Sequence, residues 1–395
     1  MTAIAPNVVS SFIENLIRSG ENPTRNLLSS QINNELLSRI RPQFYNEEDR
    51  DSLLSFSICV YQNEEQKCVL AEGMKAPHLG NDKVTTDTLY NLGSISKFIL
   101  TMMIFRMIQK YGISLDTKIT FVSEPVPHLK DITLGQLLTH RSGLKDCDFI
   151  VFTENDPLQK LLKRKENGSF DLAGLPGEKF YYANINFVLI AKYISAYLGV
   201  PLQECFVQLI GQPLGIKNIF VIEPTVRPLN LAVGYKYQAN AGLVDISNEC
   251  MFGATGFRGT PYEVSKLIQH VFTNDQFIRP ELRSILTEFI TSETFECITK
   301  SGVYQWPIRT GLGIEEKEIE MPGGSSKKIY GHGGWMDGHV SFVCYSTEDR
   351  AAYCVCASKT FGLHRNRENK LLPSVSFFNQ ITDENSTTSI QYKMR

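Results

Sequence analysis

Apolar residues recur at helical spacing through much of the middle of the chain. Residues 187–198 and 261–272 predict two clear amphipathic helices, and residues 8–42 predict one or two more near the start. Residues 94–111 are apolar around most of the helix circumference, which is typical of a helix that is buried on all sides. Because the pattern stays mainly helical from about residue 133 to 265, we expect a long helical section between the two ends of the chain.

The apolar pattern changes to that of β-strands towards both ends. Residues 55–61 and 68–71 flank a polar turn at 62–66 and predict a hairpin. After about residue 305 the pattern predicts three or four more strands, again joined by short turns, at residues 311–320, 327–330, 340–345 and 351–358. Hairpins join antiparallel strands. We therefore expect the first and last thirds of the chain to form one antiparallel sheet, with the helical section as an insertion.

Composition and charge exclude several classes of protein. Apolar residues make up 42% of the chain and aromatic residues 10%, which is enough for a large core and excludes wholesale disorder. With 40 basic and 42 acidic residues the formal net charge is −2, so we expect no nucleic-acid partner. No apolar run approaches the roughly 20 residues of a membrane-spanning helix, so we expect no membrane span.

The cysteines and the first residues of the chain favour a cytoplasmic protein. Nine cysteines, an odd number, are more typical of reduced thiols than of a disulfide framework. The first residues also lack the basic region of a secretory signal. Cysteine and histidine residues do not stand at metal-ligand spacing. We therefore expect no metal and no other cofactor.

The first candidate for chemistry is the pair Ser94 and Lys97, at the start of the predicted buried helix. A serine and a lysine three residues apart lie on one face of a helix, one turn apart. The positive end of the helix dipole and the burial of the ammonium both lower the lysine pKa, so a neutral amine can take the serine proton. The same spacing occurs twice more, at Ser142/Lys145 and Ser325/Lys328. Only Ser94 begins a long apolar helix.

The second candidate is Tyr182-Ala183-Asn184, directly before the helix predicted at 187–198. A loop tyrosine and an asparagine two residues apart can place a phenol and an amide in one cleft. The alternative is structural, with the tyrosine as an aromatic anchor and the asparagine as the N-cap of the helix.

The third candidate is the segment Gly-His-Gly-Gly-Trp at residues 331–335, which contains His332. Glycines beside a histidine at the end of a strand let the backbone approach a ligand closely and leave an N–H group to bind an oxyanion. The alternative is a surface turn that contains an incidental histidine.

Taken together and in this order, the three motifs resemble those of the serine β-lactamase and penicillin-binding-protein superfamily. The similarity is greatest to the branch related to class C β-lactamases, which includes DD-peptidases, esterases and acyltransferases. In that branch Ser-x-x-Lys is followed by Tyr-x-Asn, and then by lysine or histidine with a small residue and a glycine. The connecting segments 86–94, 112–116, 132–144 and 310–313 are also similar, so the resemblance covers roughly residues 50 to 360.

The resemblance implies a two-lobed α/β fold of the β-lactamase/transpeptidase type. In such a fold an antiparallel sheet is flanked by helices, and a mostly helical lobe is inserted into it. We expect helices in 1–50 that pack on the main lobe, an α/β lobe from 51–140 and 266–382, a helical lobe at 141–265 and a flexible tail at 383–395.

The resemblance also implies a role for each motif residue. Ser94 is then the nucleophile and Lys97 its proton acceptor, while Tyr182 relays protons to the leaving group and later activates the deacylating water or alcohol. The backbone N–H groups of Ser94 and Trp335 form the oxyanion hole. The residues expected to contact substrate are Asn184, His332, Gly333, Gly334 and Trp335.

His332 departs from the penicillin-recognising members, which have lysine at this position. A histidine is largely neutral at pH 7, so it supplies no permanent cation for a substrate carboxylate. We therefore expect a small-molecule ester or amide as substrate rather than a β-lactam. Acyl transfer to an alcohol or amine is the alternative, and a non-catalytic scaffold is a more distant one. His140, which lies in a segment that resembles a structural part of the family, is interpreted as a packed or hydrogen-bonded histidine.

Overall fold

The computed structural model describes the protein from residue 53 to residue 361, apart from gaps at 78–79, 81, 121–130, 146–172, 224–225, 239–241, 246–252, 300–301, 321–323 and 337. The helices expected within 1–50 and the tail expected at 383–395 lie outside the described residues.

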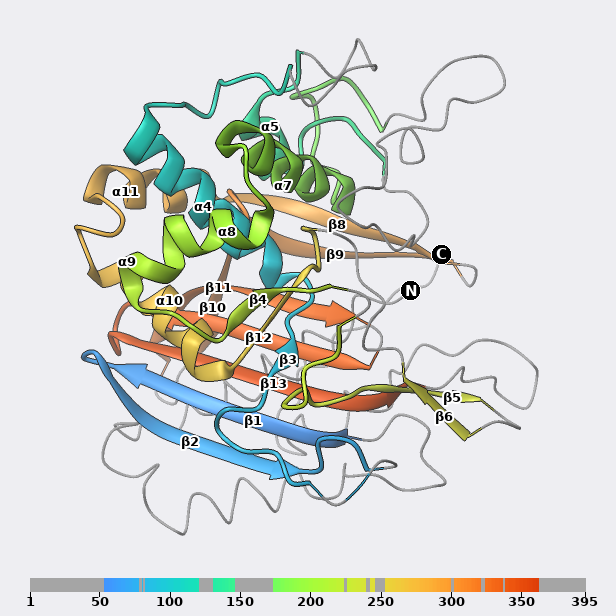
Figure 1. Cartoon of the computed structure of the whole chain (residues 1–395). Helices are drawn as coiled ribbons and strands as arrows, with labels where there is room; N and C mark the ends of the chain where they lie inside the picture. The colour runs from blue at the N-terminus through green and yellow to red at the C-terminus, as the bar shows by residue number, and fades with distance from the viewer. Residues whose placement is uncertain are drawn as a thin grey trace.

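The main element is a large antiparallel sheet in which strands from the two ends of the chain lie side by side (Figure 1). The strands follow one another in the order β2-β1-β13-β12-β11-β10-β9-β8. Their bounds are β1 (Leu53–Gln62), β2 (Glu65–Gly73), β8 (Thr291–Thr299), β9 (Gly302–Thr310), β10 (Glu315–Glu320), β11 (Ser326–Met336), β12 (His339–Ser346) and β13 (Ala351–Phe361). Cys59 of β1 lies opposite Cys354 of β13. The expected union of the first and last thirds of the chain is confirmed.

The sheet is wider than the sequence pattern predicts. The β8–β9 hairpin begins at residue 291, before the expected return of strands at about 305. Most residues of β8 are polar, so its sequence lacks the apolar alternation that identifies a half-buried strand. The first hairpin also differs, because its turn consists only of Asn63 and Glu64, both with positive φ. The expected turn at 62–66 was too long.

Helices cover one side of the sheet. They are α4 (Ile95–Tyr111), α5 (Leu134–Leu138), α7 (Asn184–Leu198), α8 (Leu202–Phe206), the π-helical turn η3 (Val207–Gly211), α9 (Gln212–Leu214), α10 (Pro261–Thr273) and α11 (Pro280–Glu288). The predicted helices at 94–111, 187–198 and 261–272 are confirmed. Gly112 ends α4 in the left-handed conformation, and the Thr260 hydroxyl caps α10 by accepting the Glu263 N–H.

In addition to its helices, the section expected to be mainly helical up to residue 265 contains four short strands. They are β4 (Ile219–Val221), β5 (Tyr235–Gln238), β6 (Gly242–Asp245) and β7 (Phe257–Gly259). β7 pairs with both β4 and β3 (Tyr90–Asn91), the strand that leads into α4. The expected lobe boundary at 265 falls inside α10, which packs on β1 and β13 of the main sheet. The division into two lobes otherwise remains a prediction.

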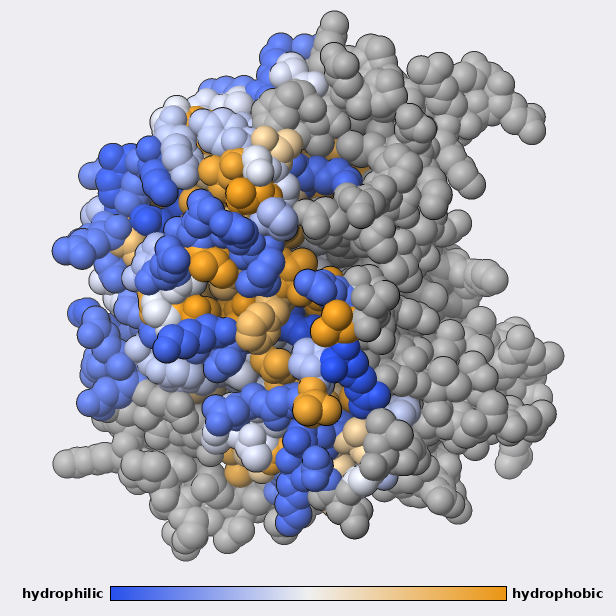
Figure 2. All heavy atoms as spheres, in the orientation of Figure 1, coloured by the Kyte–Doolittle hydropathy of each residue, from blue (hydrophilic) through white to orange (hydrophobic). Residues whose placement is uncertain are grey.

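Helix α4 lies at the centre of the larger apolar core, between the sheet and α7. Phe98, Met102 and Phe105 on this helix are fully buried. A second apolar cluster, with Phe56, Phe342 and Tyr353, is built from the alternate residues of β1, β12 and β13, which point to the opposite face of the sheet. In the face shown in Figure 2, apolar residues gather between the helices above and the strands below.

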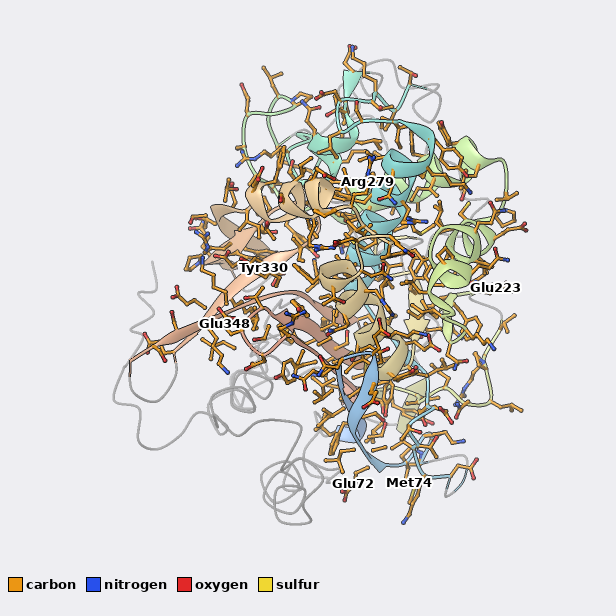
Figure 3. The ribbon with its side chains drawn as sticks, turned by 90° about the vertical axis from the view of Figure 1, so that its left-hand side faces the viewer. Glu72, Met74, Glu223, Arg279, Tyr330 and Glu348 are labelled. Atoms are coloured by element: carbon orange, nitrogen blue, oxygen red, sulfur yellow. The ribbon has the colours of Figure 1, made fainter. Side chains whose placement is uncertain are left out.

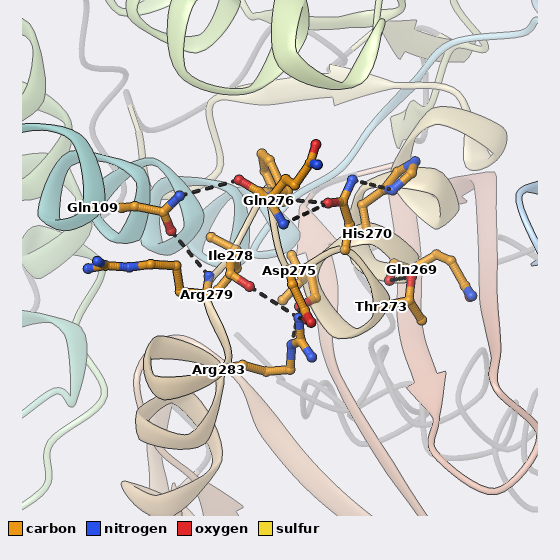
Figure 4. Close-up of polar contacts among 12 residues, drawn as sticks. Gln109, Gln269, His270, Thr273, Asp275, Gln276, Ile278, Arg279 and Arg283 are labelled. Atoms are coloured by element: carbon orange, nitrogen blue, oxygen red, sulfur yellow. Dashed lines mark hydrogen bonds and ion pairs between the residues drawn. The ribbon is translucent and has the colours of Figure 1, made fainter.

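The C-terminal half of α4 is attached by hydrogen bonds to the segment that connects α10 and α11 (Figure 4). The Gln109 side chain donates to the Gln276 carbonyl at 3.3 Å and accepts the Arg279 N–H at 3.2 Å. Arg106 donates to the Phe277 carbonyl at 2.6 Å. Figure 3 shows Arg279 at the helical end of the molecule, opposite Glu72 and Met74 near the end of β2. These contacts fix the end of α4 that lies away from Ser94.

Within the described part of the chain, no single helix has the length and hydropathy of a membrane span. Only the bent pair Asn184–Leu198 and Leu202–Leu214 meets the criterion jointly, with an angle of 80° between its two parts.

His339, the first residue of β12, is 1% exposed, and neither ring nitrogen has a hydrogen-bond partner among the described residues. Burial, together with the nearby Arg258, lowers the pKa of His339 to about 3. In the unfolded chain an ordinary histidine takes up a proton below about pH 6.5. The unfolded state therefore binds more protons in acid, and stability falls as the pH drops from 6.5 towards 3.

We predict that His339 alone makes the free energy of unfolding about 1.4 kcal/mol smaller at pH 5.5 than at pH 7.5. Urea unfolding of the wild-type protein and of His339→Phe at both pH values measures this contribution. Phenylalanine keeps the ring but cannot titrate, so the variant should lose about 1.4 kcal/mol less than the wild type. Equal losses in the two proteins would show that His339 is not buried in its neutral form.

Candidate active site

A glycine with a left-handed backbone places Ser94 beside the sheet. The chain leaves β3, passes through Gly93 at φ +54° and enters α4, whose N-cap is Ser94. A Cβ atom on Gly93 would lie 2.6 Å from the backbone nitrogen of Trp335 on β11, so only glycine fits this contact. Ser94 is partly exposed although its neighbours are buried. The turn thus presents the serine hydroxyl at the surface of a closely packed backbone junction.

Lys97 contacts Ser94 from one turn further along α4. Its side chain is fully buried, and Nζ lies 2.9 Å from Ser94 Oγ and 3.1 Å from the Ala254 carbonyl, to which it donates. The Ala254 carbonyl fixes one N–H of the amine. A neutral amine in this position keeps a lone pair that can receive the Ser94 proton.

Tyr182 contacts the same oxygen atom from the loop before α7. Its hydroxyl donates to Ser94 Oγ at 3.1 Å, and the Lys97 amine lies 5.0 Å from the centre of its ring. Asn184 is the first residue of α7 and Ala183 is the N-cap, so the interpretation of Asn184 as the N-cap is wrong. The Asn184 side chain is nearly buried, and its expected contact with substrate remains a prediction.

His332 lies inside β11, where it is 4% exposed and pairs with Val343 of β12. The alternative of a surface turn is therefore wrong. Close packing requires glycine at positions 331 and 334 of the same strand. A Cβ on Gly331 would lie 2.0 Å from the Val343 carbonyl oxygen, and one on Gly334 would lie 2.0 Å from the Leu92 carbonyl oxygen. Gly334 thus brings β11 against the turn that precedes Ser94.

The surroundings of His332 favour its neutral form. Burial lowers the pKa of His332 below 6.5, and the nearby Lys97 acts in the same direction, while Glu315 opposes them. The Glu315 carboxylate lies 4.0 Å from Nε2, and the other ring nitrogen lies 2.5 Å from the Gly333 carbonyl. The expectation of a largely uncharged His332 at pH 7 agrees with this arrangement.

The other two serines of the Ser-x-x-Lys pattern lie in different surroundings. Ser142 is buried and donates to the Asn186 side chain at 2.6 Å. Ser325 is exposed just before β11. Of the three, Ser94 alone has both a lysine amine and a tyrosine hydroxyl within hydrogen-bond distance among the described residues.

The expected oxyanion hole remains a prediction, and two features support it. Gly93 packs against the backbone of Trp335, which brings the two expected N–H donors to one junction. In the described part of the chain, the Ser94 N–H donates to no backbone carbonyl, so it can bind a developing negative charge.

Two residues near the site were not found from the sequence. Phe295 of β8 packs on Tyr182 with ring centres 4.8 Å apart, and it was missed because β8 itself was not predicted. Glu315 was missed because only the pairing of β10 with β11 brings it near His332. Among the described residues, no three His, Cys, Asp or Glu side chains are grouped so that they could hold a metal ion.

Comparisons with known proteins bear on the family and the fold of the chain. The family model for β-lactamase matches residues 46–372. Teichoic acid D-alanine hydrolase from Staphylococcus aureus is 24% identical over 247 residues, which are 62% of this chain and 61% of that protein. This chain therefore matches less than two thirds of the length of that relative.

Solved structures of several proteins share the fold, among them the following two. D-amino acid amidase from Ochrobactrum anthropi SV3, complexed with L-phenylalanine amide, has a TM-score of 0.66 at 20% identity and covers 89% of this chain and 97% of its own. The octameric penicillin-binding protein homologue from Pyrococcus abyssi has a TM-score of 0.65 at 18% identity and covers 84% of this chain and 73% of its own. The expected β-lactamase/transpeptidase-type fold is confirmed.

We predict that Ser94→Ala abolishes covalent labelling by a fluorophosphonate probe, because the reactive oxygen is lost. Ser325→Ala, the matched control from the same sequence pattern, should label to the same extent as the wild type. Intact-mass spectrometry counts the adducts. An adduct on Ser94→Ala would assign the nucleophile to another residue.

We predict that Lys97→Ala lowers turnover by about 10⁴-fold, the upper end of the range for a positioned proton acceptor. Lys97→Arg should be equally inactive, because a guanidinium does not give up its proton. Steady-state kinetics with a p-nitrophenyl ester measures both variants, after circular dichroism has shown that they fold. If Lys97→Arg kept more than about a tenth of the activity, the lysine would not be the base.

Proposed function

The chain belongs to the β-lactamase family, and from that premise we propose that it is a serine hydrolase that cleaves a small ester or amide through an acyl-enzyme. The observation that carries the proposal is the convergence of the Lys97 amine and the Tyr182 hydroxyl on Ser94 Oγ, at 2.9 and 3.1 Å. One polar group lies ready to take the serine proton, and the other can pass a proton to the leaving group.

In the proposed reaction, Ser94 Oγ attacks the substrate carbonyl and its proton passes to Lys97. The negative charge that forms on the carbonyl oxygen is bound by the N–H groups of Ser94 and Trp335. The intermediate then collapses, and Tyr182 gives its hydroxyl proton to the departing alcohol or amine and regains one from Lys97. In the second half of the reaction the steps run in reverse with water in place of the leaving group. Tyr182 passes its proton to Lys97 and takes one from the attacking water, and Lys97 returns a proton to Ser94 Oγ as the acid is released.

The charges near His332 support a substrate without a carboxylate at this position. A neutral His332 offers no cation, and the Glu315 carboxylate beside it repels a second carboxylate. The same carboxylate suits a substrate that carries an ammonium group. The names of the relatives, a D-alanine hydrolase and a D-amino acid amidase, point to acyl groups with an amine. We therefore propose acyl esters and aminoacyl esters or amides as the substrate class.

Acyl transfer to an alcohol or amine remains the alternative outcome for the same acyl-enzyme. Its first step is identical, so only the acceptor distinguishes it from hydrolysis. Assays with and without a short alcohol measure the ratio of the new ester to the free acid. A non-catalytic scaffold would show neither product.

We predict that kcat/KM for nitrocefin at pH 7.5 lies at least about 10²-fold below that for a short-chain p-nitrophenyl ester, a difference of about 2.7 kcal/mol in transition-state stabilisation. His332→Lys should raise kcat/KM for nitrocefin more than kcat/KM for the ester, because lysine supplies a cation for the carboxylate that nitrocefin carries and the ester lacks. D-alanine amide and L-alanine amide in the same assay test the aminoacyl class.

Ser94→Ala serves as the control for background hydrolysis in this assay. The proposal on substrate class is wrong if the wild type hydrolyses nitrocefin as fast as the ester and His332→Lys leaves the ratio unchanged. If no ester or amide is cleaved above the Ser94→Ala background, the proposed hydrolase function itself is wrong.

A further inference from the structure

His140 holds the backbone on both sides of Tyr182. Its carbonyl accepts the Tyr181 N–H at 2.8 Å, and its Nδ1 accepts the Ala183 N–H at 3.1 Å. His140 itself has φ +56°, a left-handed conformation that is uncommon outside glycine, although asparagine, aspartate and histidine adopt it more often than other residues. This conformation, two residues after α5, turns both the carbonyl and the ring towards the segment that carries Tyr182.

The ring of His140 also contacts the ring of Tyr182 directly. The two rings are stacked, with centres 4.3 Å apart and an angle of 25° between their planes. His140 is 2% exposed, so this contact is shielded from water. His140 therefore contacts both the ring of Tyr182 and the peptide groups on either side of it. The Tyr182 hydroxyl reaches Ser94 Oγ from this fixed ring.

A chain of hydrogen bonds determines which nitrogen of His140 carries the proton. The Ser142 hydroxyl accepts the Leu144 N–H at 3.1 Å and donates its own proton to Asn186 Oδ1 at 2.6 Å. The amide of Asn186 must then turn its NH₂ group to His140 Nδ1, which lies 3.2 Å away. With Ala183 and Asn186 both donating to Nδ1, the proton of a neutral ring lies on Nε2.

The charged and titratable groups that face His140 also disfavour a cationic ring. They are Lys97 from α4, His332 from β11 and Tyr182 from the segment before α7. Burial lowers the pKa of His140 well below 6.5, Lys97 and His332 lower it further, and the backbone contact with Ala183 offsets only a small part of this. Protonation would also place a second donor at Nδ1, against the Ala183 N–H.

We propose that His140 is a positioning residue that acts as a neutral imidazole and fixes Tyr182 on Ser94, with Ser142 and Asn186 setting its tautomer. This inference rests on the proposed function, because Tyr182 is placed there as the group that protonates the leaving group. A misplaced Tyr182 affects substrates according to how much their leaving group needs a proton. A p-nitrophenolate can leave without being protonated, whereas an alcohol or amine leaving group needs a proton as its bond to the acyl group breaks.

The test compares two esters of the same acyl group, one with p-nitrophenol and one with methanol as leaving group. His140→Asn retains a residue that tolerates the left-handed backbone and can accept a hydrogen bond, but it removes the stacked ring. We expect kcat/KM, which reports the acylation step in which the leaving group departs, to fall at least about tenfold further for the methyl ester than for the p-nitrophenyl ester. Tyr182→Phe should show the same pattern, and the double variant should be no worse than Tyr182→Phe alone.

His270→Asn is the matched control, since His270 is another buried histidine with a lowered pKa, on α10. It should leave the ratio of the two ester rates unchanged. Ser142→Ala removes only one hydroxyl group and serves if His140→Asn does not fold. Its expected effect is a shift of the ratio in the same direction by about fivefold, the typical effect of one lost hydrogen bond.

A folded His140→Asn, or a folded Ser142→Ala if the first variant does not fold, with an unchanged ratio would overturn the inference. Equal losses for both esters would overturn it too, because they indicate a general structural role. If the wild type hydrolyses neither ester above the Ser94→Ala background, the proposed function fails instead, so the two failures are distinguishable.

Discussion

The close approach of two backbone segments is the constraint on which the rest of the site depends. The turn at Leu92 and Gly93 packs against Gly334 and Trp335 of β11, and a Cβ atom on either glycine would lie 2.6 Å or less from the opposite backbone. Because both positions lack a side chain, the first turn of α4 lies directly against the central sheet. Ser94 thereby takes its position from the backbone, and the side chains that contact it are arranged around that fixed point.

The site combines one buried amine with histidines that are held neutral. Lys97 lies in contact with Ser94 Oγ, and both His140 and His332 have lowered pKa values because they are buried and face the lysine. A further positive charge in this small volume would oppose proton transfer to Lys97. In the proposed reaction, two uncharged imidazoles leave Lys97 as the principal proton acceptor, and Glu315 lies beside His332 as a negative group.

The sequence predicted the parts of the molecule that depend on local spacing. The pairing of Ser94 with Lys97 follows from helical geometry, and the union of β1 with β13 follows from hairpin patterns at both ends of the chain. Tyr182 and His332 were recognised only through the order of the motifs, since each has an ordinary structural interpretation on its own. Strand β8 is mostly polar and gave no clear strand pattern, so Phe295 was missed. The contact between His140 and Tyr182 depends on tertiary packing, which spacing in the sequence does not show.

Helix α4 and the β8–β9 hairpin contribute to the site in different ways, because they are attached to different parts of the fold. Arg106 and Gln109 attach the helix to the segment between α10 and α11, and Gly93 packs its beginning against β11, so Ser94 stands on a helix that is held at both ends. The β8–β9 hairpin, by contrast, lies last in the strand order and meets the site through Phe295. Substitutions in that hairpin can therefore change the surroundings of Tyr182 without altering the contacts that position Ser94. The contacts that position Ser94 and the strand that lies against Tyr182 therefore belong to separate parts of the fold.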